Sequence, residues 1–156
     1  MNAKVIPIIT RLNGHEALTD PSEPLGALSE FYRAFNRRDL ALLQRNWVSS
    51  EDACLAHPLG GIRHGWADIR EGYERIFRSA VVVSLELYDY TIHCSGEMFY
   101  AIGREQGTLR SDDFSLEVKF RTSRLFRFTG GRWHQVHHHG SIDNPELLLR
   151  YQAAIR

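Results

Sequence analysis

Apolar positions in the first half of the chain recur with the spacing of helices. Between residues 24 and 36 they return every three or four positions, which places them on one face of a helix. Asp39 can cap a second such segment, which runs to Trp47. A third apolar stripe follows Gly65 and predicts a helix that ends at Arg78. We therefore expect three helices in the first half of the chain.

The second half of the chain is rich in β-branched and aromatic residues, and we interpret it as long strands. Strands are expected over residues 81–94, 98–110 and 114–128. A Gly-Gly pair at residues 130–131 predicts a hairpin turn, because glycine adopts positive φ without a steric clash. The strand after this turn carries residues 134–139, which hold four of the eight histidines of the chain.

The order of the elements predicts an α+β fold. Helices come first, a brief strand is expected at residues 53–57, and long hairpin strands follow. Asn144 can cap a short final helix that ends at Ile155. We expect a cone-shaped roll, in which the N-terminal helices pack on a strongly curved antiparallel sheet and leave a ligand cavity. Residues 1–21 are expected to form a loosely ordered arm or a short edge strand, and residues 22–156 a single domain.

Composition and charge narrow the class of partner. The 156 residues are 43% hydrophobic and 24% charged, which is ordinary for one globular domain. Lys plus Arg and Asp plus Glu both number 19, and the lack of a basic excess disfavours nucleic acid as the main partner. The apolar run at residues 5–9 is too short for a membrane span or a typical signal peptide, so we expect a cytoplasmic protein. Cys54 and Cys94 give no disulfide framework and are expected to be small buried side chains.

The histidine-rich strand raises the question of a metal site. Plain alternation along a strand would divide its side chains between two faces, with Trp133, Gln135, His137 and His139 on one and His134, Val136 and His138 on the other. A pair such as His137 and His139 can hold zinc or iron. A third ligand would have to come from another strand, for example His93. No Asp or Glu lies at a spacing from these histidines that is typical of a metal ligand. We therefore predict no metal site.

Four segments of the chain resemble the nuclear transport factor 2-like superfamily. They are residues 31–39, 56–60, 64–69 and 131–141. This superfamily includes SnoaL-like polyketide cyclases, ketosteroid isomerase and the association domain of calcium/calmodulin-dependent protein kinase. The resemblance covers about residues 22–142 and implies the cone-shaped fold. It leaves the function open, because the same fold hosts isomerases, dehydratases, cyclases and non-catalytic assembly modules.

The resemblance to ketosteroid isomerase implies two catalytic residues. His57 stands before Pro58, where that enzyme has its catalytic aspartate, and a histidine can act as a general base near neutral pH. The second acid of that enzyme falls at Arg124, a cation suited to hold a developing oxyanion. The oxyanion tyrosine falls near Phe31, with Tyr32 beside it. No organic cofactor is implied.

The resemblance to the association domain implies an anion-binding pocket instead. The Ser-Arg pair at residues 123–124 is similar to a Thr-Arg pair in that domain. The pocket arginines fall on Arg104 and on the arginine of this pair, whereas a third falls on Gly140 and is missing. Two arginines facing the cavity would suit a carboxylate, phosphate or enolate oxygen. The alternative is that they pair with Glu105, Glu117 or an acid from the helices.

The resemblance also divides the histidine strand between two surfaces. Val136, His138 and Gly140 would face the cavity, and His137 and His139 would lie on the outer side of the sheet. In this superfamily that outer side is used for dimerisation. We therefore expect a homodimer that forms through the open sheet face.

Aromatic residues on the helices complete the predicted ligand-binding set. Tyr32, Trp47, Trp66 and Tyr73 can line the cavity together with Arg104 and His138, or they can simply be core. Two functions stay open. The first is an isomerase-, dehydratase- or cyclase-type enzyme that acts on a small carbonyl or acidic compound, with His57 as base and Arg124 as oxyanion stabiliser. The second is a non-catalytic anion-binding or oligomerisation module.

Overall fold

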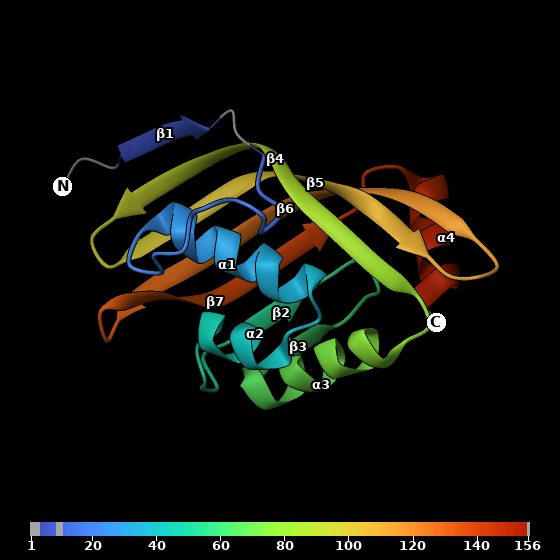
Figure 1. The fold of residues 1–156 in the computed structure, drawn as a ribbon, viewed down its shortest axis with the longest axis horizontal. Coiled ribbons are helices and arrows are strands. Elements are labelled where there is room, and N and C mark those ends of the chain that lie inside the picture. Colours follow the sequence, from blue (N-terminus) through green and yellow to red (C-terminus); the bar gives the residue numbers. More distant parts are fainter. Residues whose placement is uncertain (1–3, 9–10, 156) are drawn as a thin grey trace.

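The computed structural model describes residues 4–8 and 11–155 (Figure 1). The helices are α1 (Pro24–Asn36), α2 (Leu40–Asn46), α3 (Gly65–Arg78) and α4 (Pro145–Ile155). The strands are β1 (Lys4–Ile8), β2 (Cys54–Ala56), β3 (Ile62–His64), β4 (Val82–Ser95), β5 (Met98–Arg110), β6 (Ser115–Thr129) and β7 (Arg132–Ser141). No helix within the described ranges combines the length and apolar character that crossing a membrane requires. Residues 1–3 of the predicted arm lie outside the described residues.

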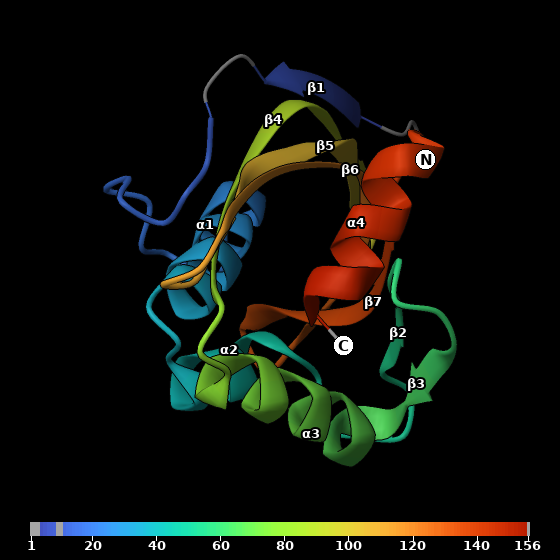
Figure 2. The ribbon, with the colours of Figure 1, turned by 90° about the vertical axis from the view of Figure 1, so that its right-hand side faces the viewer.

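The strands form a mixed sheet in the order β1-β4-β5-β6-β7-β2-β3. All neighbouring strands are antiparallel except β2, which runs parallel to β7. Helices α1, α2 and α3 lie on the concave side of the curved sheet, and α4 crosses its open end (Figure 2). The predicted α+β fold is confirmed. The parallel pairing and strand β3 were not predicted, because both depend on where a loop returns in space.

Local sequence signals account for the ends of several elements. The Asp39 side chain accepts a hydrogen bond of 2.9 Å from the backbone N–H of Leu42, and Asn144 accepts one of 3.0 Å from Leu147. Both side chains satisfy backbone donors that a helix leaves unpaired in its first turn. Gly130 and Gly131 have φ angles of 60° and 82°, as a tight hairpin turn requires. The caps predicted at Asp39 and Asn144 and the predicted turn are confirmed, whereas Ser22, which could also have capped a helix, bonds to Asp20 instead.

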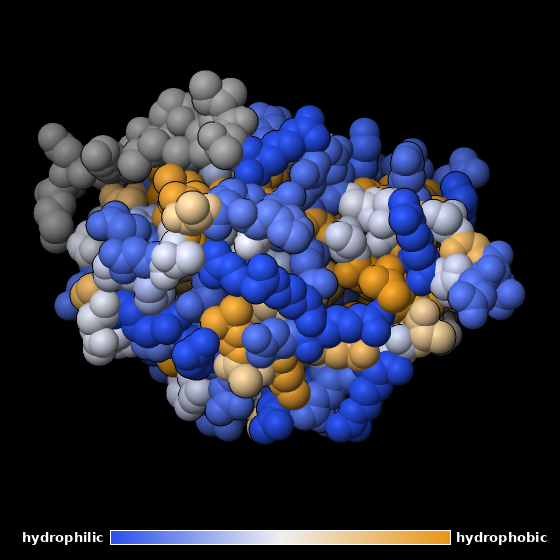
Figure 3. All heavy atoms as spheres, in the orientation of Figure 1, coloured by the Kyte–Doolittle hydropathy of each residue, from blue (hydrophilic) through white to orange (hydrophobic). Residues whose placement is uncertain are grey.

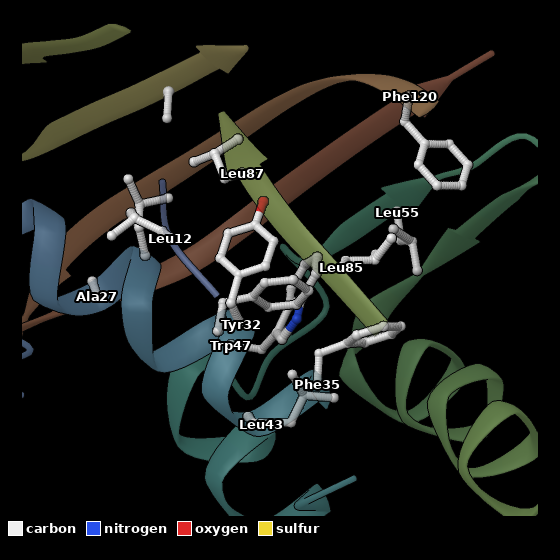
Figure 4. Packing of buried hydrophobic residues seen from close by; sticks show 14 of the residues in the cluster. Leu12, Ala27, Tyr32, Phe35, Leu43, Trp47, Leu55, Leu85, Leu87 and Phe120 are labelled. Carbon is white, nitrogen blue, oxygen red and sulfur yellow. The ribbon is translucent and has the colours of Figure 1, made fainter. Parts of the chain in front are cut away.

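The hydrophobic core fills the space between the concave sheet face and the helices. Leu85 and Leu87 of β4 point toward Tyr32 and Phe35 of α1, and Trp47 lies beneath them (Figure 4). Trp47 and Tyr32 have no exposed surface. These large side chains therefore form a wall inside the cone. The core ends at this wall, and a cavity lies between it and the open end of the cone.

A β-bulge in β7 changes which side chains face inward. Leu125 of β6 pairs with His137, whereas Phe126 pairs with Gln135, so Val136 is an extra residue without a partner. The bulge brings Gln135 and His138 to the same concave face. Plain alternation predicted opposite faces for these two residues, and that prediction is wrong. Val136, which was expected to face the cavity with His138, is the bulged residue and is not among the residues that line a cavity.

Candidate functional site

Two connected chambers open at the wide end of the cone. The inner chamber has a volume of about 80 Å³, more than twice the volume of one water molecule (about 30 Å³). The outer chamber has a volume of about 510 Å³ and reaches from the inner one to the loop before α3. Both are bordered by His57, Tyr73 and Ile155. Apolar surface gathers in a hollow between α3 and the start of β4 (Figure 3), where Val81 and Val83 line the outer chamber.

A buried ion pair forms the polar wall of the inner chamber. Arg124 Nη2 donates to Glu105 Oε1 at 2.8 Å, and the two side chains are only 1% and 3% exposed. The hydroxyl of Tyr32 donates to the same Glu105 oxygen at 2.8 Å and accepts a hydrogen bond from Arg124 Nε at 3.2 Å. Arg124 Nη1 donates to Gln135 Oε1 at 2.8 Å, and the Phe31 ring lies 3.7 Å from the guanidinium carbon. The guanidinium is thus fixed by protein groups.

Strand register brings the two charges of this ion pair together. Arg124 is paired with Ala101, and Glu105 with Phe120, so one row, formed by Gly103 and Thr122, lies between the two charges. The long Arg124 side chain spans this row to reach Glu105. A Cβ atom at Gly103 would lie 2.4 Å from the Cβ of Tyr90, so this position accepts only glycine because Tyr90 of β4 packs against it.

The ion pair continues into a hydrogen-bonded network toward the helices. Gln135 Nε2 donates to Asn46 Oδ1 at 3.3 Å, and Asn46 Nδ2 donates to Glu30 Oε1 at 3.1 Å. Glu30 also forms an ion pair with Arg132. Because Gln135, Asn46 and Glu30 are all buried, each bond in this path removes the cost of an unsatisfied polar group. The network anchors Arg124 from the side opposite the chamber.

Burial sets the protonation of the groups around the chamber. It lowers the pKa of His138 to well below its usual value, and the charge of Arg124 adds to this effect. It also lowers the pKa of His57, to which Arg63 contributes. Burial raises the pKa of Tyr73 to about 12. At neutral pH the two imidazoles and the phenol are therefore uncharged, and the chamber holds one cation paired with one anion.

His57 lies at the rim where the two chambers meet. Its Nδ1 accepts a hydrogen bond of 3.2 Å from the backbone N–H of Leu59. In the neutral ring the proton therefore resides on Nε2, which can donate to a ligand. To accept a proton on Nδ1, the ring must first release Leu59.

His138 lies on the floor of the inner chamber. Its Nε2 is 2.9 Å from Thr122 Oγ1 and 3.9 Å from Glu105 Oε1. Its Nδ1 is buried and has no hydrogen-bond partner among the described residues. A Cβ atom at Gly140 would lie 3.4 Å from the His138 ring, so the glycine keeps the space beside the imidazole open.

The structure brings four of the predicted site residues together at the chambers. His57, Tyr73, Arg124 and His138 line the inner chamber. Tyr32 does not line it and instead contacts the ion pair from behind.

The other three predicted site residues lie elsewhere. Trp47 and Trp66 are core residues that line neither chamber. Arg104 lies on the outer face of the sheet, opposite Arg121, with its Nη1 3.7 Å from Asp143. The expectation that Arg104 and Arg124 both face the cavity is therefore wrong. The cause is strand alternation, which turns Arg104 outward and its neighbour Glu105 inward.

Two important residues of the site were missed or undervalued from sequence. Glu105 was considered only as an ion-pair partner, although Phe99 and Ala101 show which face of β5 is apolar. Counting by twos from those residues would have placed Glu105 inside. Gln135 could not have been placed, because its orientation depends on the bulge. The alternative that Arg124 pairs with Glu105 is the one observed.

The histidines on the outer face form no metal centre. His137 Nδ1 is 2.9 Å from the backbone oxygen of Cys54, and His139 borders a shallow groove with Arg104 and Arg121. Within residues 4–8 and 11–155, no group of three or more His, Cys, Asp or Glu side chains is arranged to hold a metal ion. The outer positions of His137 and His139 agree with the predicted division of the strand.

Comparison with known proteins confirms the predicted superfamily. The sequence profile of the SnoaL-like domain matches residues 25–145. The F-box protein SKIP8 of Arabidopsis thaliana is 22% identical over an alignment of 145 residues, and the match covers 90% of this chain and 60% of that protein. The chain thus spans about 60% of the length of the curated relative that it matches.

Solved structures from bacteria share the fold. A protein from Streptomyces avermitilis, whose name proposes a dehydratase of the NTF2-like family, has a TM-score of 0.69 and 20% identity, covering 81% of this chain and 97% of its own. A protein from Thiobacillus denitrificans has a TM-score of 0.63 and 20% identity, covering 78% of this chain and 95% of its own. Its name proposes a calcium/calmodulin-dependent protein kinase type II association domain. At these identities the likeness shows the fold alone.

Proposed function

The chain belongs to the SnoaL-like domain family, and we propose that it is an enzyme that moves a proton on a small, mostly apolar carbonyl compound held in the two chambers. The reaction class is that of an isomerase, dehydratase or cyclase. One observation carries the proposal. Neutral and ionised polar groups from three different parts of the fold, His57, His138 and the Glu105–Arg124 pair, converge on one apolar chamber. Such convergence is typical of ligand sites.

His57 is the proposed proton-transfer residue. It lies at the rim of the inner chamber, it is neutral at pH 7, and its Nε2–H is not committed to the contact with Leu59. A neutral imidazole can hydrogen-bond a carbonyl oxygen through Nε2–H and, once Nδ1 has released Leu59, take the α-proton on Nδ1, which gives a cationic ring and an enolate. The proposal needs no organic cofactor.

Arg124 takes a positioning role in this proposal. Its contacts with Glu105, Tyr32 and Gln135 favour an architectural use of the guanidinium over direct contact with a free anion. The pairing with Glu105 also cancels the charge that would attract an anionic ligand. An uncharged ligand therefore fits the chamber better than the acidic compound that the sequence also allowed.

Proton exchange with solvent tests the enzyme proposal. Cyclohexanone and acetophenone would be incubated with the protein in D₂O, and loss of the α-proton signal would be followed by NMR. We expect exchange above the buffer rate, and a loss of about 100-fold in His57→Gln. The matched control is His64→Gln, an exposed histidine outside both chambers. Equal exchange with and without protein, over a broad set of ketones, would contradict the proposal.

A second candidate function, assembly, is favoured by the outer face of the sheet. Met98, Tyr100 and Ile102 alternate along β5 and are 36%, 40% and 48% exposed. A row of large apolar side chains on an open sheet face suits contact with a second copy of the chain. We expect Ile102→Lys to convert a dimer to a monomer in sedimentation velocity. The control is Ile62→Lys, at a residue on β3 that is 58% exposed, and a sedimentation coefficient unaffected by Ile102→Lys would count against this interface.

A further inference from the structure

We infer that Glu105 is the residue that recognises the ligand, and that the inner chamber selects a neutral hydroxyl donor over a carboxylate. This inference rests on the proposed function, because it requires that the chambers hold a small molecule. It deepens that function by naming a further contact residue and the chemical class of the ligand. The resemblance to ketosteroid isomerase implies that Arg124 contacts the ligand. In this inference Arg124 instead holds Glu105 in position.

The first step of the argument concerns the free capacity of Arg124. Each of its three nitrogens already donates to a protein acceptor, namely Tyr32, Gln135 and Glu105. One face of the guanidinium is covered by the Phe31 ring. Two of its five N–H groups remain, one on Nη1 and one on Nη2, but the side chain is only 1% exposed. A ligand carboxylate that reached them would lie beside the Glu105 carboxylate, which already accepts from Nη2.

The second step concerns the free capacity of Glu105. Its hydrogen bonds with Tyr32 and Arg124 both use Oε1, and His138 approaches the same oxygen at 3.9 Å. Within the part of the chain that the structure describes, no group hydrogen-bonds to Oε2. Glu105 borders the inner chamber. An ionised carboxylate is only an acceptor, so the group that completes its hydrogen bonding must be a donor.

The third step concerns charge. The two histidines of the chamber, His57 and His138, are neutral at pH 7, and the single cation is already paired. A ligand carboxylate would therefore meet the Glu105 carboxylate without a compensating charge in a poorly solvated space. A hydroxyl group carries no net charge and donates the missing hydrogen bond. The chamber chemistry therefore favours an alcohol, a phenol or an enol.

The fourth step concerns the rest of the ligand. Phe35, Leu85, Phe120 and Tyr151 line the same chamber, and the Phe120 and Tyr151 rings meet edge to face with centroids 5.4 Å apart. These walls suit an apolar or aromatic body. The ligand class is thus a small carbonyl compound with an apolar frame that also carries a hydroxyl, or presents one as its enol, and this hydroxyl points to Glu105.

Three probes of similar size test the inference. Phenol, toluene and benzoate would be titrated into the protein at pH 7.5, and dissociation constants and chamber contacts would be measured by NMR. We expect phenol to bind at least about tenfold more tightly than both toluene and benzoate. Tighter binding of benzoate, or equal binding of phenol and toluene, would overturn the inference while leaving the proposed function intact. Failure of all three probes to contact the chamber would also overturn the inference, while the exchange of cyclohexanone and acetophenone tests the proposed function separately.

Variants assign the preference to Glu105. Glu105→Gln is expected to reduce the phenol-to-toluene ratio about tenfold, whereas the matched control Glu117→Gln, on the exposed side of β6, leaves it unchanged. An unchanged ratio in Glu105→Gln would overturn the inference.

Because Glu105→Gln leaves Arg124 unpaired and can unfold the protein, a second variant replaces the whole pair. Glu105→Leu/Arg124→Met is expected to fold and to bind toluene and phenol equally, since it removes both charges together. Retention of the phenol preference in this variant would also overturn the inference.

Discussion

Arg124 Nη2 and Glu105 Oε1 lie 2.8 Å apart in the wall of the inner chamber, and neither side chain is more than 3% exposed. Burial alone would lower the pKa of Arg124, but the neighbouring Tyr32 and Glu105 raise it above its usual value. The arginine therefore stays charged at every pH at which the protein folds. Each buried charge is stabilised by the other. The free energies of unfolding of the two single variants and of the double variant therefore measure how strongly the pair is coupled.

Removal of Arg124 alone should strongly destabilise the fold. We expect Arg124→Met to lower the free energy of unfolding by about 3–5 kcal/mol, because Glu105 is left as a buried unpaired charge. The control Arg104→Met, on the outer face of the neighbouring strand, should change it by less than about 0.5 kcal/mol. Urea denaturation monitored by tryptophan fluorescence measures both. Similar losses in the two variants would show that Arg124 is not the anchor described above.

Removal of both charges should be far less harmful than removal of one. In Glu105→Leu/Arg124→Met, the penalty for an unpaired buried charge disappears and apolar packing replaces it. We expect a free energy of unfolding within about 2 kcal/mol of the wild type. The difference between the double variant and the sum of the single variants gives the coupling energy of the pair. A double variant as unstable as that sum would mean that the two residues act independently.

Stability should fall as the medium becomes mildly acidic. The pKa of His138 is lowered in the folded protein. Below pH 6.5 the unfolded chain therefore binds a proton at His138, whereas the folded chain does not. The contribution of this histidine is complete above pH 6.5 and is lost as the pH falls toward the lowered pKa. The slope is at most about 1.4 kcal/mol per pH unit.

The histidine responsible can be identified by substitution. His138→Gln should flatten the dependence of unfolding free energy on pH between 7.5 and 5, since glutamine does not titrate. His139→Gln changes an exposed neighbour on the outer face and should leave the slope as it is. Urea denaturation at a series of pH values measures the slope. An unaltered slope in His138→Gln would assign the effect to another group.

The size of the inner chamber depends on Gly140. A Cβ atom there would make ordinary van der Waals contacts, 3.4 Å from the His138 ring and 3.8 Å from Pro58. We therefore expect Gly140→Ala to fold normally and to bind toluene with little change. Gly140→Leu should fill the chamber and weaken toluene binding by at least about tenfold. Undiminished toluene binding in the leucine variant would mean that ligands use another site.

Helix α4 should open more readily than the rest of the fold. It has no fully buried residue, and it is held to the loop after β2 by a bond of 2.9 Å from Gln152 Nε2 to the backbone oxygen of Pro58. Gln152→Ala should increase hydrogen exchange in α4 several-fold without changing the exchange of β5 and β6. Gln44→Ala, on the exposed face of α2, is the control. Uniform acceleration along the whole chain would indicate global destabilisation instead.

The periodicity of the sequence was enough to predict the α+β class and most of its helices and strands. Helical stripes, strand-forming runs and capping residues such as Asp39 and Asn144 are local signals, and they gave elements close to the observed ones. The site was harder, because it depends on pairings between strands. The direction of Glu105 could have been counted from its apolar neighbours on β5. Its partnership with Arg124 could not, because that requires the register of β5 against β6.

The bulge at Val136 decides how strand β7 responds to a change in its length. Gln135 pairs with Phe126 and His137 with Leu125, so the register on the two sides of Val136 is continuous without it. Deleting Val136 would therefore remove the bulge and leave His138 inside and His137 and His139 outside. A residue inserted or deleted elsewhere in the strand would shift the register by one and exchange its inside and outside, so homologues should vary in length at position 136 and not at its neighbours.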